Sequence, residues 1–303
     1  MEYILETHNL TKEFDKRPAI KDVNMHLRQG DIYNVVGRHG SGKSTLLNII
    51  AGLSFPTSGY YELYGKLADQ DNIHKERVGS LMSSPGLYND LTVFDNVKLK
   101  SLALGLNNND ELTSILISVG LIDLTNSLVR TLSFDQKKLL GVAIALVGNP
   151  DIIILDEPTV GLNGTNSNLI RDLILELHEK GKTIVVSSPG YYEISRISNM
   201  FGFMDNGALT DELTDEAIIE FCTRHIDIRT SDAPKACTVL EGLGITRYLV
   251  KDKETIHIYE WFDRSAEIAE ALVKNDVQLL ELVKNNLNIN SFFQKKMGFG
   301  INS

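Results

Sequence analysis

The sequence predicts an α/β fold, in which a mixed sheet is interrupted by a helical insert, followed by a small α+β domain of ferredoxin-like order. Three observations lead to this prediction. A glycine-rich loop at 37–45 stands between a buried apolar strand and a helix. A second apolar strand ends in two carboxylates, Asp156 and Glu157. From about His225 the pattern changes to short strands and helices without such motifs, which indicates a separate domain.

The composition is that of an ordinary globular protein that is long enough for two domains. The chain has 303 residues, of which 43% are hydrophobic and 23% are charged, and its formal net charge is −10. This acidic balance opposes a nucleic-acid surface, because such binding depends on Lys and Arg neutralising phosphates. We therefore expect no nucleic-acid partner.

The sequence does not support a membrane span, a secretion signal or a cysteine framework. The longest apolar run, Leu139–Val147, is well short of the roughly 18 residues that a membrane span needs. The N-terminus lacks the basic and apolar stretches of a signal peptide. Cys222 and Cys237 are isolated, and the seven histidines show no metal-ligand spacing. We expect a reduced cytoplasmic setting, in which any membrane association goes through a partner.

The loop at 37–45 fits the phosphate-binding pattern G-x-x-x-x-G-K-[ST]. Its glycines let successive N–H groups face one anion, and the following helix adds its positive N-terminal end. The alternative is a glycine-rich turn with a surface lysine, which the flanking strand and helix disfavour. We expect Lys43 to reach the β- and γ-phosphates of a nucleotide and Ser44 to ligate Mg²⁺. The candidate binding residues of the loop are Gly37, Arg38, His39, Gly40, Ser41, Gly42, Lys43, Ser44 and Thr45.

Hydrophobic periodicity places the other elements of this first domain. Strands are expected at 3–10, 23–27, 32–36 and 59–65, with a helix at 46–51. The stretch from 92 to 147 is mostly helical in period, with breaks at 107–109 and 131–133. A helical block at this point, about 82–147, is a distinct subdomain. A buried strand at 182–187 and a closing hairpin at 200–209 complete the domain.

The apolar run Ile152–Leu155 predicts a fully buried parallel strand that ends at Asp156 and Glu157. Ligands of open α/β sheets bind beyond the carboxyl ends of such strands. We expect Asp156 to hold Mg²⁺ through water and Glu157 to polarise the water that attacks a γ-phosphate. The alternative is a solvated carboxylate pair that caps the next helix, and the nearby phosphate loop disfavours it.

The order of phosphate loop, helical insert, Leu132-Ser133 and Ile153–Thr159 resembles the ATP-binding subunit of ABC transporters over about residues 1–215. The sequences of residues 140–146 and 78–81 are most similar to those of the bacitracin-resistance and lantibiotic-immunity branch. The resemblance implies ATP and Mg²⁺ as cofactors and Glu157 as the catalytic residue of a transport-coupled ATP hydrolase.

The resemblance also implies contacts outside the loop. Ser133 and Gln136 fall in the family's signature loop, which clamps the γ-phosphate of ATP bound by the opposite subunit. Phe14 falls where an aromatic ring stacks on adenine. A plain core aromatic is the alternative reading of Phe14, because aromatic burial is common.

The chain departs from the family pattern in four places, one of which is the signature loop. The signature Leu-Ser-Gly-Gly-Gln reads Leu132-Ser133-Phe134-Asp135-Gln136 here, so Asp135 brings negative charge toward a phosphate. The other departures are Ser83 for a Gln or Glu, Asn163 for an Asp, and Pro189 for the switch histidine. Together they suggest a weakened ATPase. Nucleotide binding is expected to survive, because Lys43, Ser44 and Asp156 remain.

Residues 224–303 are expected to form an accessory domain with the order β-α-β-β-α-β and a terminal helix. Strands are expected at 225–229, 245–250, 255–259 and 277–282, and helices at 233–243, 265–274 and 289–297. A packing or dimerisation module is the main interpretation, with ligand sensing as the other. Trp261-Phe262 is expected in a core or interface.

The predicted function is that of an ATP-binding subunit at the cytoplasmic face of the cell membrane. It would power export of, or immunity to, a peptide or antimicrobial through separate integral membrane subunits. The alternative is a catalytically weak or silent nucleotide-binding regulatory subunit of a heterodimeric system. The unit could be a homodimer or a heterodimer with another ATP-binding subunit, and the departures at Asp135 and Pro189 favour the heterodimer. The acidic charge and single phosphate loop oppose an ABC protein of translation or DNA repair.

Overall fold

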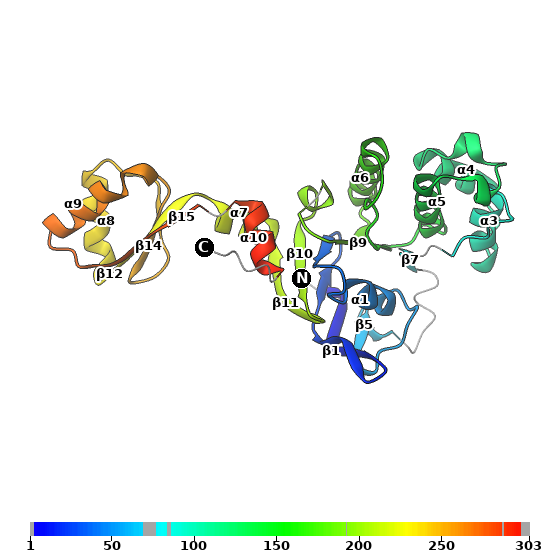
Figure 1. The fold of residues 1–303 in the computed structure, drawn as a ribbon, viewed down its shortest axis with the longest axis horizontal. Helices are drawn as coiled ribbons and strands as arrows, with labels where there is room; N and C mark the ends of the chain where they lie inside the picture. Colours follow the sequence, from blue (N-terminus) through cyan, green and yellow to red (C-terminus); the bar gives the residue numbers. More distant parts are fainter. Residues whose placement is uncertain (1–2, 69–76, 84–85, 192, 287, 298–303) are drawn as a thin grey trace. The chain divides into compact units, whose positions relative to one another are not determined.

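The computed structural model describes residues 3–68, 77–83, 86–191, 193–286 and 288–297. The chain divides into two compact units, each with its own contacts (Figure 1). The first is Met1–Asp215 with Lys296–Gly300, and the second is Glu216–Lys295 with Ile301–Ser303. In the part of the chain that is described, none of the helices is both long and apolar enough to cross a bilayer.

A six-stranded sheet in the first unit carries the carboxyl ends at which ligands are expected. Its strand order is β11-β10-β4-β9-β8-β7, and every pairing is parallel except that of β10 with β11. Every residue of β4, β8 and β9 is buried, as expected for strands covered on both faces. The strands are β4 (Ile32–Val36), β7 (Val78–Leu81), β8 (Ile152–Leu155), β9 (Thr183–Ser188), β10 (Met200–Asp205) and β11 (Ala208–Thr214).

A second sheet has the order β2-β1-β5-β6, with β3 also paired to β1, and all of these pairings are antiparallel. Helix α1 (Lys43–Ile50) buries its apolar side chains in a core shared with residues of both sheets, so the two sheets sandwich it. The strands are β1 (Tyr3–Phe14), β2 (Arg17–Val23), β3 (His26–Arg28), β5 (Ser58–Leu63) and β6 (Lys66–Leu67).

The prediction of a single strand at 23–27 is wrong. The structure has two strands there, β2 ending at Val23 and β3 beginning at His26. Both pair with the long strand β1, but at different stretches of it: Leu10 is opposite Val23, and Glu6 is opposite His26. Pairing with a common partner therefore decides where each strand stops, which the alternation of apolar residues does not report.

The helical insert and the helix that follows the acidic pair pack together against residues of the six-stranded sheet, in a core separate from that of α1. Side chains of α3 (Val93–Ala103), α4 (Asn109–Ser118), α5 (Phe134–Leu146) and α6 (Gly164–Glu179) share one buried apolar cluster. The first three of these helices lie together in Figure 1, apart from β1 and β5. Their starts are set by capping side chains. Thr92, Asn108 and Ser133 accept hydrogen bonds from the backbone N–H groups of the residues three positions later, Asp95, Glu111 and Gln136.

The second unit has the predicted ferredoxin-like order. Its antiparallel sheet runs β13-β14-β12-β15, and α8 and α9 cover one face over a core that includes Ile226 and Ile228. Helix α7 (Asp215–Cys222) lies outside the elements expected from the sequence. The elements are β12 (His225–Thr230), α8 (Ala233–Gly242), β13 (Tyr248–Val250), β14 (Thr255–Ile258), α9 (Ser265–Lys274), β15 (Leu279–Asn285) and α10 (Ile289–Lys296).

Candidate functional site

The loop between β4 and α1 is held in a shape that only glycine permits at two positions. Gly42 has φ +103°, and a Cβ there would lie 2.7 Å from the carbonyl oxygen of Ala19. A Cβ on Gly37 would lie 2.4 Å from the carbonyl oxygen of Met204. Gly42 is also the N-cap of α1 and supplies no capping side chain, so the first N–H groups of the helix face the loop. The backbone therefore forms a concave, electropositive cradle suited to an anion.

Lys43 is fixed at the centre of this cradle. Its side chain is 4% exposed, and Nζ donates to the carbonyl oxygens of Gly37 at 2.7 Å and Arg38 at 3.1 Å. Nζ also lies 3.5 Å from Glu157 Oε1. Burial lowers the pKa of Lys43, and the charge of Glu157 opposes that shift. The loop thus places one desolvated ammonium between its own carbonyls and the acidic pair.

Ser41 shows that the cradle fits a phosphate. Its Oγ is buried and has no hydrogen-bond partner in the described part of the chain. A buried hydroxyl without a partner is costly, and an anion in the loop would accept a hydrogen bond from it. Gly40, Ser44 and Thr45 line the cavity of about 600 Å³ at the loop. His39 lies at the rim, 79% exposed, with Nδ1 3.9 Å from Glu157 Oε1.

The side chain of Arg38 pairs with a residue at the end of β10. Its guanidinium donates to Asp205 Oδ1 at 2.8 Å, at the end of β10. This ion pair ties the phosphate loop to the neighbouring strand. The arrangement assigns Arg38 a role in holding the loop rather than in lining the cavity.

The acidic pair lies where the parallel strands end, beside the loop. Asp156 is 1% exposed, and its Oδ1 accepts from Ser187 Oγ at 2.6 Å. Its Oδ2 accepts from Ser83 Oγ. The Ser187 hydroxyl in turn accepts from the backbone N–H of Glu157 at 2.8 Å. Three neighbouring strand ends thus orient the pair, and carboxylate and hydroxyl oxygens are the ligands that Mg²⁺ prefers.

Glu157 is held in the left-handed backbone region, with φ +48°. For a residue with a Cβ this conformation costs about 1–2 kcal/mol. It is maintained here by the bond from its N–H to Ser187, and it turns the side chain toward Lys43. Glu157 and Ser83 line both the cavity at the loop and a second one of about 510 Å³ beside Asp156. A strained carboxylate between two cavities is suited to act on a bound molecule.

Phe14 lies at the phosphate-loop cavity and not in the core. Its side chain is 56% exposed, and it lines the same cavity as Lys43 and Thr45. The ammonium of Lys12 is 5.2 Å from its ring centroid. The core-aromatic reading of Phe14 is therefore wrong, and an exposed ring face is available to stack on a flat ligand.

Ser133 and Gln136 form the capping box of α5. Ser133 Oγ accepts from the Gln136 N–H at 3.2 Å, and Gln136 Oε1 accepts from the Ser133 N–H at 2.9 Å. Neither is among the described residues that line the phosphate-loop cavity. Within one chain, these two side chains stabilise a helix start.

The sequence did not predict that three polar side chains lie beside the acidic pair. Ser187 and Ser83 hold Asp156, as described above. Lys138 lines the cavity beside Asp156, and its Nζ donates to the carbonyl oxygen of Val160 at 2.6 Å. Burial lowers the pKa of Lys138, and the charges of Glu157 and Asp156 oppose the shift. The one signal that could have indicated Ser187 was its position at the carboxyl end of a predicted buried strand.

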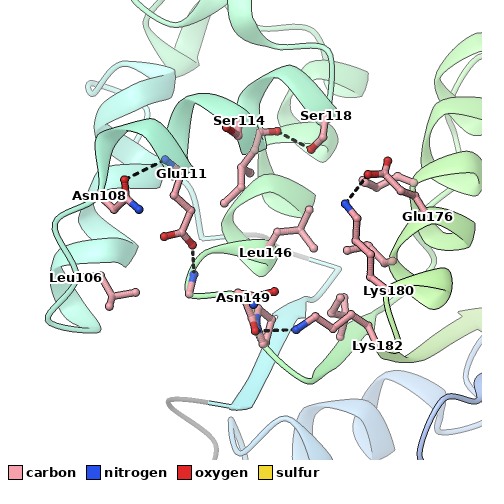
Figure 2. A pocket seen from close by; sticks show the side chains of 16 residues that line it. Leu106, Asn108, Glu111, Ser114, Ser118, Leu146, Asn149, Glu176, Lys180 and Lys182 are labelled. Carbon is pink, nitrogen blue, oxygen red and sulfur yellow. Dashed lines mark hydrogen bonds and ion pairs between the residues drawn. The ribbon is translucent and has the colours of Figure 1, made fainter.

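A separate cavity of about 640 Å³ lies between α4 and α6 and contains none of the predicted site residues. Figure 2 shows its polar groups paired with one another. Glu111 accepts from the backbone N–H of Gly148 at 3.3 Å, and Lys182 donates to the carbonyl oxygen of Asn149 at 3.0 Å. The phosphate-loop cavity, where charged groups converge, remains the candidate site.

Comparison with known proteins gives consistent matches along the chain. Residues 20–160 match the family described as ABC transporter. The chain is 32% identical over 304 residues to the bacitracin transport ATP-binding protein BcrA of Enterococcus faecalis, covering 99% of this chain and 98% of that protein. It is 34% identical to the lantibiotic transport ATP-binding protein SrtF of Streptococcus pyogenes, covering 68% of this chain and 89% of that protein.

Solved structures agree with the fold of the first unit. A bacterial ABC transporter cassette described as dimeric superposes with a TM-score of 0.66 at 27% identity, covering 69% of this chain and 98% of that one. A second structure, described as a post-hydrolysis state bound to ADP and Pi, gives a TM-score of 0.65. Since the match to BcrA extends over nearly the whole of both chains, the chain belongs to the ABC transporter family and is one of its ATP-binding, ATP-hydrolysing subunits.

Proposed function

We propose that this chain powers a transporter that exports a peptide or other antimicrobial, or gives immunity to it, through separate integral membrane subunits. The similarity to the bacitracin transport protein supports this reading, because it extends through the second unit and not only the cassette. The names of these two relatives concern bacitracin transport and lantibiotic transport. The chain would then work at the cytoplasmic face of the membrane, in a pair of ATP-binding subunits. The domain boundaries that go with this function are 1–215 for ATP binding and 224–303 for the accessory domain.

The observation that best supports ATP hydrolysis in this proposal is the distance of 3.5 Å between Lys43 Nζ and Glu157 Oε1, at the glycine-rich loop. In this proposal the loop N–H groups, Ser41 and Lys43 bind the phosphates of ATP, and the Phe14 ring stacks on the base. Ser44 and Asp156 would hold Mg²⁺, which neutralises charge on the β- and γ-phosphates. A cation and a carboxylate held this close suit phosphate binding followed by water activation.

Glu157 has the catalytic role in the proposal. Its carboxylate would orient a water toward the γ-phosphate and accept its proton. Lys43 would bind the charge that develops on the phosphate oxygens. Ser133 and Gln136, at the start of α5, would contact the ATP held by a second ATP-binding subunit.

The test of hydrolysis is Glu157→Gln, which keeps the size of the side chain and removes the base. We expect unchanged ATP binding by calorimetry and a loss of phosphate release of roughly 100-fold or more. Glu176→Gln, on the exposed face of α6, is the matched control. Undiminished turnover in a folded Glu157→Gln protein would remove Glu157 from the mechanism.

The test of transport uses the chain together with the membrane-protein genes that neighbour its own. Expressed in a sensitive bacterium, the set should raise resistance to a peptide antimicrobial such as bacitracin, and Lys43→Ala should abolish the increase. Full resistance with the Lys43→Ala chain would show that its ATP site does not drive transport.

A further inference from the structure

Three side chains with metal-ligand atoms converge on one face of the sheet in the second unit. His225 and Asp227 stand two residues apart on β12, so they point to the same face. His257 on β14 is directly opposite Asp227 in the antiparallel register. Ile226 and Ile228 point the other way, into the core beneath α8 and α9. The polar cluster thus occupies the sheet face opposite the helices.

The spacing of the three ligand atoms fits one small cation. Nε2 of His225 is 3.0 Å and Nε2 of His257 is 3.2 Å from Asp227 Oδ1, and all the ligand atoms lie within 4.8 Å of one another. Ligands of a tetrahedral ion with bonds of about 2.0–2.2 Å lie roughly 3.4 Å apart. Small rotations of the side chains would bring the cluster to that geometry.

The contacts of the His225 ring direct one nitrogen, Nε2, into the cluster. Its Nδ1 contacts the carbonyl oxygen of Thr223, which can only accept a hydrogen bond, so Nδ1 is the donor of that bond and Nε2 is the ring atom directed at Asp227. Ligating histidines characteristically donate their other ring N–H to such a carbonyl. The amide of Asn285 is 3.5 Å from Nε2, at the limit of a hydrogen bond.

Two buried atoms of the cluster lack hydrogen-bond partners among the described residues: Asp227 Oδ1 and His257 Nδ1. Asp227 Oδ1 therefore faces two ring nitrogens at hydrogen-bond distance without hydrogen-bond geometry. A buried carboxylate oxygen in that position is costly, and a cation between it and the nitrogens would remove the cost. The nearby ammonium of Lys251, which would repel a cation, is paired with Glu220.

The two imidazoles stack with centroids 4.6 Å apart and planes at 20°. For both Nε2 atoms to point at one ion, each ring turns about χ2, a torsion with a broad energy well in histidine. The His225 side chain is 3% exposed, His257 19% and Asp227 33%, so the cluster opens to water on one side. A water or a further ligand could occupy the remaining coordination position.

We propose that His225, Asp227 and His257 form a binding site for a divalent transition-metal ion of the zinc class, with one position open to solvent. Imidazole nitrogens suit zinc, copper and nickel, and a single carboxylate completes a three-ligand set of the kind that zinc accepts. The site is separate from the phosphate loop and joins β12 to β14. The histidines are 32 positions apart in the chain, so strand pairing assembles the site and no local spacing reveals it.

The experiment is a calorimetric titration of the metal-stripped full-length chain with ZnCl₂, without nucleotide or Mg²⁺. We expect a site that His257→Ala and Asp227→Asn each remove, lowering the bound zinc by one ion per chain or weakening it at least roughly 100-fold. His178→Ala, a histidine on α6 of the first unit, is the matched control and should leave the isotherm unchanged. Circular dichroism and ATP binding verify that each variant is folded.

Replacing zinc by Co²⁺ gives a second readout. The wild type should show visible absorption bands of a four-coordinate ion with nitrogen ligands, and His257→Ala should lose them. If folded His257→Ala and Asp227→Asn bind zinc as the wild type does, or if no variant alters a weak, non-saturating isotherm, the wild type holds an adventitious ion only. Either result overturns the proposal.

Discussion

The carboxylate of Asp135 accepts a hydrogen bond from the side-chain amide of Asn163 at 2.7 Å. Both residues depart from the pattern of the family, and each lies at the start of a different helix, α5 or α6. The same oxygen, Oδ2, also accepts from the Asn163 N–H at 3.2 Å and from Asn166 Nδ2 at 2.9 Å. The two departures therefore satisfy each other within one chain, and the Asp135 charge is partly compensated before any nucleotide approaches.

The first prediction concerns that charge. Asp135→Asn keeps an acceptor for Asn163 and removes the anion, so ATP turnover should rise a few-fold to about tenfold, the effect of relieving about 1 kcal/mol of repulsion. Asp135→Gly should also turn over faster but lose about 1–2 kcal/mol of stability, since it gives up the hydrogen bonds and adds backbone freedom. Phosphate release and thermal unfolding measure both effects.

The control for this series is Asp172→Asn, an exposed position on α6 that pairs with Arg171. It should change neither rate nor stability by much. If a folded Asp135→Asn protein hydrolyses ATP no faster than the wild type, the charge of Asp135 does not limit turnover.

The second prediction concerns nucleotide affinity. Lys43→Ala should abolish measurable ATP binding, because a charge-assisted contact is worth about 1.5–3 kcal/mol, or roughly 10- to 150-fold in affinity. Calorimetry with ATP measures the loss. Lys180→Ala, on an exposed turn after α6, should bind as the wild type does. Equal affinity of the Lys43→Ala protein would refute the assignment of the phosphate site.

The third prediction compares the two serines that hold Asp156. Ser187 donates to Asp156 and accepts from the Glu157 N–H, whereas Ser83 donates to Asp156 alone. Ser187→Ala should therefore reduce turnover more than Ser83→Ala, and both should raise the Mg²⁺ concentration needed for half-maximal rate. The measurement is steady-state turnover against Mg²⁺. A Ser83→Ala effect larger than that of Ser187→Ala would contradict this ranking.

The fourth prediction concerns Phe14. Stacking of a base on an aromatic ring is worth about 1–3 kcal/mol, so Phe14→Ala should weaken ATP binding roughly 5- to 150-fold while Phe14→Trp retains it. Stability should hardly change, because the ring is 56% exposed. Phe55→Ala, at another exposed ring, is the control for general surface effects. Unaltered ATP affinity in Phe14→Ala would show that the base lies elsewhere.

Local features were predictable because their parts are neighbours in the chain. The loop at 37–45 carries its own geometry in its glycines, and the pair Asp156-Glu157 directly follows its buried strand. The ferredoxin-like order beyond His225 also follows from periodicity, since each short element has its own apolar face. By itself, then, the sequence determined the fold class, the phosphate loop and the kind of chemistry.

Contacts between distant segments were decided only by the tertiary structure. Ser83 and Ser187 reach Asp156 because β7, β8 and β9 are adjacent, and the order of strands in a sheet is not written in any one strand. The exposure of Phe14 and the bond between Asp135 and Asn163 likewise depend on packing between elements far apart in sequence. Strand register decides which residues of two paired strands lie opposite each other, about 4–6 Å apart. It is a property of the pairing and cannot be read from the composition of either strand.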